Sequence, residues 1–522
     1  MSAAVAEKRK PLISIKDLKQ YFPVRGKRNM FVKANDGITL DIFEGETLGV
    51  VGESGCGKST LGRVLLQLYN QTDGETIYYG RSLESIAPLY ALDIYKNLAK
   101  KCASSKEATK KLEMLEAEYE KLEAATKGSE DQAKLKDLYA KLNEKNQFKS
   151  KAHNEFISIV RLVGGFYASK DFDEVTRVLV DYYKSLLTIK SIEIGLTKTN
   201  LDIAELEYKS NKEPNQKNES KLESLKKQRD KVVDNELKNA KNVRDQKFAT
   251  VEALRESYKD DAEFQKYEAY RDDGVDLASL NYDEMRHLRK DLQIIFQDPY
   301  SSLNPRLTVG QIISEGPLTH SKFESNNERA SEYTMQVMEN CGLASYMIHR
   351  YPHQFSGGQR QRIGIARALA VEPKFVVCDE AVSALDVSIQ SQIINLLKDL
   401  KDKENLTYMF ISHDLSVVKY ISDRIAVMYL GNIVELCTSQ KMFDKPLHPY
   451  TVALLSAIPT TDADSKDKDM IILEGDIPSP VNPPKGCKFN TRCIDVMDIC
   501  KEVVPVWKEQ EPEHFVACHK YN

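Results

Sequence analysis

The sequence predicts an α/β fold that is interrupted by a long helical insertion. Two observations support this prediction. An apolar strand at Thr47–Val51 runs into a glycine-rich turn and an apolar helix, and a charged segment with little glycine or proline begins near residue 84. A chain of 522 residues also exceeds the size of one ordinary domain. We predict four segments: the first part of the α/β domain at 1–83, the insertion at 84–280, the second part of the α/β domain at 281–440, and a small C-terminal domain at 441–522.

Charge and hydropathy exclude several classes of protein. The chain has 74 Lys and Arg against 78 Asp and Glu, so no overall basic field favours nucleic acid or an anionic membrane. The basic residues Lys8–Lys10 are followed by the strand-like Leu12–Ile15 and not by the apolar core of a signal peptide. No run approaches 18 apolar residues. We therefore expect a cytosolic protein that contacts a membrane only through partners.

The insertion shows helical periodicity on a polar background. Apolar residues recur at spacings of three and four, at Leu112, Leu115, Tyr119, Leu122, Leu135, Leu138 and Leu142, and less regularly at Leu222, Leu225, Val232 and Leu237. Between them, Phe156–Leu187 is more apolar. We predict a coiled-coil-like hairpin with a small helical tip, whose arms of about forty residues would extend about 60 Å. A partly disordered charged loop is the alternative, because Pro214 interrupts the second arm.

The glycine-rich turn matches the G-x-x-x-x-G-K-[ST] phosphate-binding loop. Its residues are Gly52, Glu53, Ser54, Gly55, Cys56, Gly57, Lys58, Ser59 and Thr60. In such a loop the glycines let backbone N–H groups converge on phosphate oxygens, Lys58 would hold the β- and γ-phosphates, and Ser59 would bind Mg²⁺. The motif predicts a nucleoside triphosphate site and leaves the family open.

A second motif is the apolar strand Phe375–Cys378, which ends in two adjacent carboxylates. A buried strand of this kind can deliver Asp379 to the Mg²⁺ shell and Glu380 to the attacking water. An Asp-Glu pair at a strand end is often only a solvated turn, but here it accompanies a phosphate-binding loop.

Ser356, Gly357, Gly358 and Gln359 precede an arginine-rich helix, about 20 residues before the Asp-Glu strand. This arrangement resembles the signature of ABC ATPases, with Phe355 where leucine is usual. The resemblance implies a RecA-like core, an antiparallel β-subdomain and a helical signature subdomain. It also implies a dimer in which the signature contacts ATP bound by the opposite subunit.

Further ABC elements follow in the family's order. Gln297 resembles the Q-loop glutamine that senses Mg²⁺, Ser383 and Asp386 resemble the D-loop, and His413 resembles the switch histidine. Tyr21 or Phe22 resembles the aromatic residue that stacks on adenine, with Phe22 preferred. The resemblance thus implies ATP hydrolysis by Lys58, Gln297, Glu380 and His413.

Three stretches resemble the ATPases of oligopeptide and dipeptide permeases, in particular the second, F-type, ATPase of the pair: Gln297–Arg306, His448–Thr451 and Gly475–Pro480. The resemblance implies import of peptides by a heterodimer with a paralogous ATPase, two transmembrane permease subunits and an extracytoplasmic peptide-binding protein. The chain would then lie at the cytoplasmic face of the cell membrane, without nucleic acid. Nothing in the family's pattern accounts for residues 84–280.

Four cysteines follow a proline-rich stretch in the pattern C-x5-C-x6-C-x17-C, at Cys487, Cys493, Cys500 and Cys518. Four soft thiolates suit Zn²⁺ or an iron–sulfur cluster. The segment Cys487–Cys493 is similar to an element that binds a [4Fe–4S] cluster in peptide-permease ATPases, so the resemblance implies that cluster. Zinc and unligated thiols are the alternatives.

SMC-like chromosome and DNA-repair ATPases are the main rival, since they too place a coiled coil between phosphate loop and signature. In those proteins the coil leaves after the Q-loop and is far longer, whereas this insertion precedes Gln297. Tandem ABC translation factors would need two cassettes, and the sequence has one.

Overall fold

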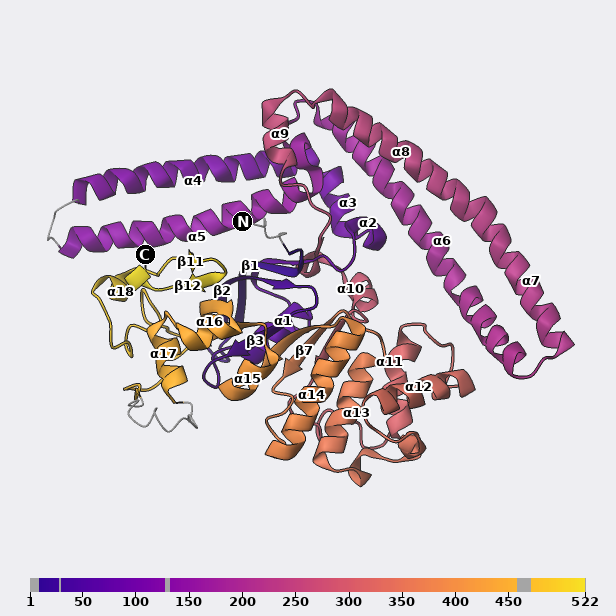
Figure 1. The fold of residues 1–522 in the computed structure, drawn as a ribbon. Coiled ribbons are helices and arrows are strands. Elements are labelled where there is room, and N and C mark those ends of the chain that lie inside the picture. The colour runs from indigo at the N-terminus through magenta and orange to yellow at the C-terminus, as the bar shows by residue number, and fades with distance from the viewer. Residues whose placement is uncertain (1–8, 28–29, 127–131, 458–470, 522) are drawn as a thin grey trace, which may run out of the picture. The chain divides into compact units, whose positions relative to one another are not determined.

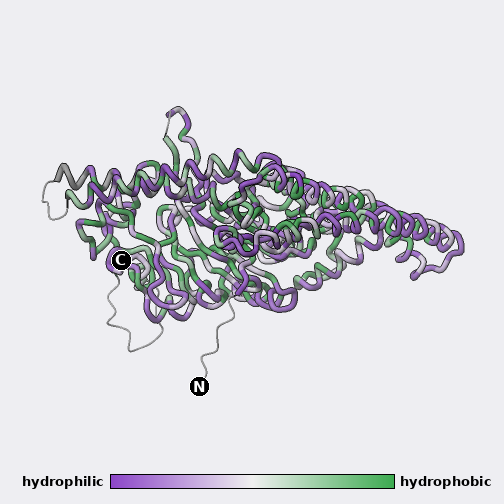
Figure 2. Tube along the Cα trace, turned by 90° about the horizontal axis from the view of Figure 1, so that it is seen from above, coloured by the Kyte–Doolittle hydropathy of each residue, from purple (hydrophilic) through white to green (hydrophobic). Residues whose placement is uncertain are grey.

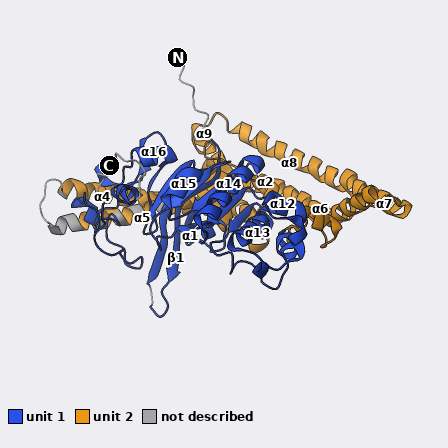
Figure 3. Cartoon of the chain, turned by 60° about the horizontal axis from the view of Figure 1, so that its bottom comes forward, with its two compact units in different colours: residues 1–80, 285–316, 334–522 blue, residues 81–284, 317–333 orange. Residues whose placement is uncertain are grey.

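The computed structural model describes residues 9–27, 30–126, 132–457 and 471–521. The chain divides into two compact units (Figure 3). Unit 1 comprises Met1–Gly80, Met285–Gly316 and Thr334–Asn522, and unit 2 comprises Arg81–Glu284 and Pro317–Tyr333. None of the described helices combines the length and the hydropathy that crossing a membrane requires.

The main sheet of unit 1 has its strands in the order β11-β12-β10-β9-β3-β8-β7-β6 (Figure 1). The strands are β3 (Thr47–Val51), β6 (Leu292–Ile295), β7 (Phe375–Asp379), β8 (Thr407–Ile411), β9 (Arg424–Tyr429), β10 (Asn432–Thr438), β11 (Lys508–Glu511) and β12 (His514–Val516). From β9 to β6, neighbouring strands are parallel. All residues of β3, β7 and β8 are buried, as expected for parallel strands covered on both faces.

A smaller antiparallel sheet of unit 1 contains β1 (Pro11–Pro23), β2 (Phe31–Phe43) and β4 (Asp73–Tyr78), with β1 in the middle. The other helices of unit 1 lie around the main sheet and are interspersed with its strands along the chain. They are α1 (Lys58–Leu65), α13 (Gly357–Leu369), α14 (Val387–Glu404), α15 (Leu415–Ile421), α16 (Ser439–Asp444), α17 (Pro449–Ser456) and α18 (Ile499–Glu502). Three helices run across the boundaries between the units: α10 (Tyr282–Leu288), α11 (Val309–Thr319) and α12 (Glu328–Asn340).

The C-terminal segment is continuous with the main sheet. Strand β12 pairs antiparallel with β10 and with β11. The buried His514 side chain shares a hydrogen bond of 2.8 Å with Glu435 of β10. Strands β11 and β12 therefore extend the main sheet, and the segment is grouped with unit 1, where the sequence had suggested a separate small domain at 441–522.

Unit 2 contains two antiparallel helix pairs, which corrects the predicted single hairpin. One pair is α4 (Leu98–Thr126) with α5 (Gln132–Val163), and the other is α6 (Phe172–Lys212) with α7 (Gln216–Val232) and α8 (Lys238–Ser257). A π-helical turn, Val233–Leu237, joins α7 to α8. The shorter elements of this unit are α2 (Leu83–Ile86), α3 (Leu89–Lys96), α9 (Ala262–Glu268) and β5 (Val275–Asp276).

The apolar segment Phe156–Leu187 forms a core and not an exposed tip, which is a second correction. It covers the end of α5, the 3-10 turn Gly164–Ala168 and the start of α6. Its side chains pack with those of α3 and α9 in one buried cluster that includes Phe166, Tyr183 and Phe264. Apolar side chains gain free energy by leaving water, and this junction offers burial that the end of an isolated hairpin cannot.

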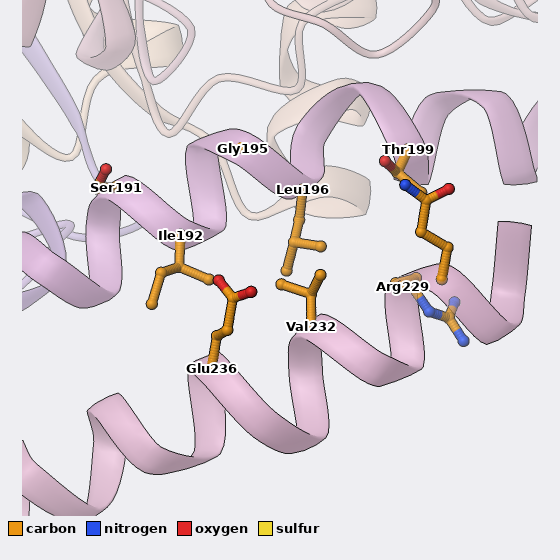
Figure 4. A pocket seen from close by; sticks show the side chains of 9 residues that line it. Ser191, Ile192, Gly195, Leu196, Thr199, Arg229, Val232 and Glu236 are labelled. Atoms are coloured by element: carbon orange, nitrogen blue, oxygen red, sulfur yellow. The ribbon is translucent and has the colours of Figure 1, made fainter.

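The second helix pair turns at Pro214, which the sequence had placed inside an arm. The turn is followed by Asn215, whose side chain caps α7 by accepting a hydrogen bond of 2.9 Å from the Lys217 amide. Along the pair, Leu196 of α6 faces Val232 of α7 (Figure 4). No residue of α7 is buried, and hydrophilic residues predominate toward the turn of this arm (Figure 2).

Candidate functional site

The phosphate-binding loop lies between the buried strand β3 and helix α1. Gly52 and Gly57 have φ angles of 151° and 104°, in the region that favours glycine. A Cβ atom at Gly52 would come within 2.1 Å of the Met428 carbonyl oxygen, and one at Gly57 within 2.1 Å of the Ala34 carbonyl oxygen. Both positions therefore require glycine for conformation and for space.

Lys58 and Ser59 begin α1 and point into the loop region. The Lys58 ammonium donates hydrogen bonds of 2.8 and 3.1 Å to the carbonyl oxygens of Gly52 and Glu53. The Ser59 hydroxyl donates a hydrogen bond of 2.5 Å to Asp379, which ends β7 and is 1% exposed. Arg63 also contacts the Asp379 carboxylate, at 3.4 Å. The structure thus brings the serine and the aspartate predicted for Mg²⁺ to hydrogen-bonding distance.

Glu380, Gln297 and His413 form a second group. The Gln297 amide donates a hydrogen bond of 2.7 Å to the Glu380 carboxylate, and the His413 ring nitrogen lies 3.6 Å from the same carboxylate oxygen. Glu380 has a positive φ of 48°, and its amide donates a hydrogen bond of 3.1 Å to the Ile411 carbonyl oxygen of β8. These three residues follow β6, β7 and β8, so the carboxyl ends of adjacent parallel strands bring them together.

A cavity of about 330 Å³ connects the two groups. Its lining includes Lys58, Ser59 and Glu380, together with Ser54, Gly55, Gly57 and Thr60 of the predicted loop. Phe22 and Pro480 form another part of the wall. Tyr21 does not line it, because its hydroxyl hydrogen-bonds to Asp36. Of the two aromatic candidates, the structure places Phe22 at the cavity.

The signature residues occupy a different place. Ser356 caps α13, accepting a hydrogen bond of 3.4 Å from the Gln359 amide, while the Gln359 side chain accepts one of 3.1 Å from the Ser356 amide. Gly358 packs so closely on Ile389 of α14 that a Cβ atom would lie 2.4 Å from it. Within the described part of the chain, Ser356–Gln359 do not line the cavity at Lys58. The N-terminus of α13 is therefore exposed at Ser356 and does not contribute to this cavity.

The D-loop residues support the neighbouring elements. The Ser383 hydroxyl donates a hydrogen bond of 3.0 Å to the Glu380 carbonyl oxygen, which fixes the turn after β7. Asp386 caps α14 by accepting a hydrogen bond of 3.0 Å from the Ile389 amide. Both side chains therefore hold the backbone around Glu380.

Three of the nine predicted loop residues, Gly52, Glu53 and Cys56, are not among the residues that line the cavity. Cys56 is buried, and burial raises the pKa of its thiol. The Glu53 carboxylate accepts two hydrogen bonds from the Arg492 guanidinium, at 2.8 and 3.0 Å. Arg492 lies within the segment Cys487–Cys493, and the sequence predicted no role for it. Its spacing from the cysteines could not reveal a partner 439 residues away.

A second ion pair ties the same C-terminal element to the N-terminal sheet. The Lys488 ammonium lies 2.9 Å from Asp36 of β2 and donates a hydrogen bond of 2.9 Å to the Leu430 carbonyl oxygen. Burial would raise the pKa of Asp36, but the charge of Lys488 together with hydrogen bonds from Tyr21 and Lys488 holds that pKa below its usual range. Between these two contacts the Phe489 ring is buried against Tyr429 and Tyr450.

The four clustered cysteines face one another. Burial raises the pKa of the Cys487 thiol to about 12, and the charges of Cys500, Cys518 and Cys493 raise it further. The Phe489 amide donates a hydrogen bond to the Cys487 sulfur, and the amides of Asp495 and Lys520 do the same for Cys493 and Cys518. The Cys487 amide also donates to the Cys500 carbonyl oxygen at 2.8 Å. The fold therefore gathers all four sulfurs in one place.

The structure also contains a group of possible metal ligands that the sequence did not predict. The ligand atoms of Glu435, Cys437 and His514 lie within 4.8 Å of one another and are buried. The Glu435 carboxylate already accepts hydrogen bonds from the Leu447 and His448 amides, at 2.8 and 2.9 Å, in addition to the contact with His514. This network connects β10, β12 and the start of α17, and we interpret its role as structural.

The comparisons with known proteins identify the family of the chain. The sequence profile of the ABC transporter family matches residues 35–165 and 270–383. A profile described as the oligopeptide/dipeptide transporter C-terminal region matches residues 434–500. Fold and site thus define an ABC transporter ATP-binding protein.

The relatives narrow this class. The oligopeptide transport ATP-binding protein AppF of Bacillus subtilis is 53% identical over 253 residues, which cover 48% of this chain and 76% of AppF. OppF of Salmonella typhimurium, also named an oligopeptide transport ATP-binding protein, is 52% identical over 249 residues, covering 47% of this chain and 74% of OppF. The chain belongs to the oligopeptide/dipeptide transporter family of ABC ATP-binding proteins.

Solved structures are less similar to this chain in sequence. The ATP-binding cassette MJ0796, solved as a dimer with ADP and phosphate, is 14% identical, with a TM-score of 0.41 over 82% of this chain and 98% of that chain.

The Arg492–Glu53 pair leads to a prediction for stability. Arg492→Ala removes two charge-assisted hydrogen bonds from a guanidinium that is 7% exposed, and we expect it to lower the free energy of unfolding by about 1–3 kcal/mol. Arg492→Lys should recover only part of this, because an ammonium cannot make the bidentate contact. Guanidinium chloride denaturation measures the change.

The matched control is Lys501→Ala, which removes an exposed ion pair with Asp498 and should change the free energy of unfolding by less than about 0.5 kcal/mol. Equal stability of the Arg492→Ala and Lys501→Ala variants would contradict a stabilising role for the Glu53 contact.

Proposed function

We propose that this chain is the ATP-hydrolysing subunit of a membrane transporter that imports oligopeptides or dipeptides. One observation carries the enzymatic part: Ser59 contacts Asp379, Gln297 and His413 contact Glu380, and Ser59 and Glu380 line the cavity at the phosphate-binding loop. The transport part is supported by the names of the relatives and by the C-terminal profile. These favour a peptide importer over the SMC-like alternative.

Each residue of the site has a separate proposed role in ATP hydrolysis. Lys58 would neutralise the β- and γ-phosphates of ATP, and loop amides from Gly52 to Thr60 would donate to phosphate oxygens. Ser59, Asp379 and Gln297 supply oxygen ligands suited to Mg²⁺, which would draw charge from the phosphates. Glu380 would accept a proton from the attacking water, with Gln297 orienting its carboxylate and His413 contacting the γ-phosphate. Phe22 would stack on adenine.

The signature supports assembly with a second ATPase. Ser356 and the amides of Gly357 and Gly358 lie at a helix N-terminus, where the helix dipole favours an anion. Because this N-terminus does not line the chain's own cavity, we propose that it completes the ATP site of a paralogous partner subunit. Two transmembrane permease subunits would then hold the heterodimer at the cytoplasmic face of the membrane and receive peptide from an extracytoplasmic binding protein.

The four cysteines are proposed to hold a [4Fe–4S] cluster. Four thiols on one site, with amide donors to three of the sulfurs, have the chemistry of a thiolate-ligated centre. The choice of an iron–sulfur cluster over zinc therefore rests on the similarity of Cys487–Cys493 to the cluster-binding element of peptide-permease ATPases.

Replacing Glu380 tests the catalytic assignment. Glu380→Gln keeps the size of the side chain and removes the base, so ATP binding should persist while turnover falls by about 10²- to 10⁴-fold. Glu404→Gln, at the exposed end of α14, is the control and should keep normal turnover. Steady-state phosphate release and equilibrium nucleotide binding provide the two readings. Near-normal turnover in Glu380→Gln would remove Glu380 from its role.

Metal analysis tests the cluster. The protein purified without oxygen should contain about four iron atoms and about four acid-labile sulfides per chain and absorb visible light. Cys500→Ser should lose most of the iron, whereas Cys341→Ser, at a buried cysteine outside the group, should retain it. Zinc in place of iron in the wild-type protein would contradict the proposal.

A further inference from the structure

Unit 2 contains a pocket of about 550 Å³, and none of its lining residues belongs to the proposed ATP site. It lies where the start of α4 and the end of α5 meet α9 (Figure 1). Four lysines line it, Lys106, Lys110, Lys149 and Lys266, and a single carboxylate, Glu113. We call this feature the lysine-rimmed pocket. Pockets of this volume hold small ligands or single anchoring segments.

The remaining wall of the lysine-rimmed pocket is aromatic. Phe156 contacts Tyr267 and Tyr270 edge to face, with ring centroids 5.9 and 5.6 Å apart. Tyr270 is 44% exposed, while Phe156 and Tyr267 are partly buried against the core of unit 2. These rings offer apolar surface to a side chain that enters from outside.

No ion pair neutralises these lysines among the residues that the structure describes. Lys106 lies over the Tyr167 and Phe172 rings, 5.3 and 5.8 Å from their centroids, and Lys266 lies over Tyr267. Among the described side chains, none of the four lysines has an ion pair with a carboxylate. In a chain whose net charge is −4, this is a local excess of positive charge. An anionic ligand would complement it.

The lining favours carboxylates over phosphates. Phosphate sites commonly combine lysines with arginine forks, glycine-rich turns or helix N-termini, and the described lining contains no arginine, no glycine and no residue of a helix N-terminus. Lys106 and Lys110 lie one helical turn apart, about 6 Å along α4. Alternate side chains of an extended peptide are spaced by nearly the same distance, about 6.8 Å. A row of carboxylates therefore matches the lysines better than one compact phosphate group.

We propose that the lysine-rimmed pocket binds an extended acidic peptide segment of another protein, with one aromatic or aliphatic side chain seated against Phe156, Tyr267 and Tyr270. The insertion then serves as a docking module. This goes beyond the proposed function and does not depend on ATP hydrolysis.

The test measures binding of fluorescein-labelled hexapeptides to the purified full chain by fluorescence anisotropy. The probe set carries one Phe, Leu or Trp among glutamates, and matched peptides have lysines in place of glutamates. We expect saturable binding of the acidic set alone, weakened by added salt. Absence of saturable binding up to about 1 mM peptide, or tighter binding of single-stranded RNA or ATP at this pocket, would overturn the proposal.

Variants locate the binding. Lys110→Glu with Lys149→Glu reverses two charges for which the described residues show no ring contact and no ion pair, and should weaken acidic-peptide binding about tenfold. Tyr270→Ala should weaken it severalfold by removing part of the apolar wall. The control, Lys217→Glu with Lys221→Glu, changes two exposed lysines one turn apart on α7 and should leave binding intact. Equal losses in control and pocket variants would show nonspecific attraction and refute the assignment.

Discussion

Three buried parallel strands, β3, β8 and β7, position most of the residues that we propose for catalysis. Parallel neighbours end at the same edge of a sheet, so the turns that follow them share one small volume. The phosphate-binding loop follows β3, Asp379 and Glu380 end β7, and His413 follows β8. Strand β6 adds Gln297 from the next position. Because these strands are fully buried, the hydrophobic effect that stabilises the sheet also fixes the distances in the site.

The C-terminal segment participates in the same construction. It adds β12 and β11 to the main sheet, and its Arg492 and Lys488 reach the phosphate-binding loop and β2. The residues between Cys487 and Cys493 thus contact the loop that would bind ATP while their two ends belong to the cysteine group.

The candidate catalytic residues could be predicted from the sequence because each lies in a short contiguous motif whose spacing is typical of that chemistry. The gathering of Lys58, Asp379, Glu380 and His413 could be expected from strand order alone. The Arg492–Glu53 pair could not, since a contact between residues so distant in the sequence leaves no local pattern. Helical periodicity likewise predicted the helices of the insertion without their pairing, because the spacing of apolar residues does not say which helix covers them. Phe156–Leu187 was therefore placed at a tip when it forms a core.

The central claim is that this ATPase works within a membrane transporter, and identification of its natural partners tests it most directly. The chain would be isolated from its own membranes in mild detergent under conditions that preserve complexes, and the co-purifying proteins identified by mass spectrometry. The account predicts a second ABC ATPase and two integral membrane subunits in equal amounts with this chain. Recovery of the chain with chromosomal DNA and DNA-associated proteins, and without membrane subunits, would contradict it.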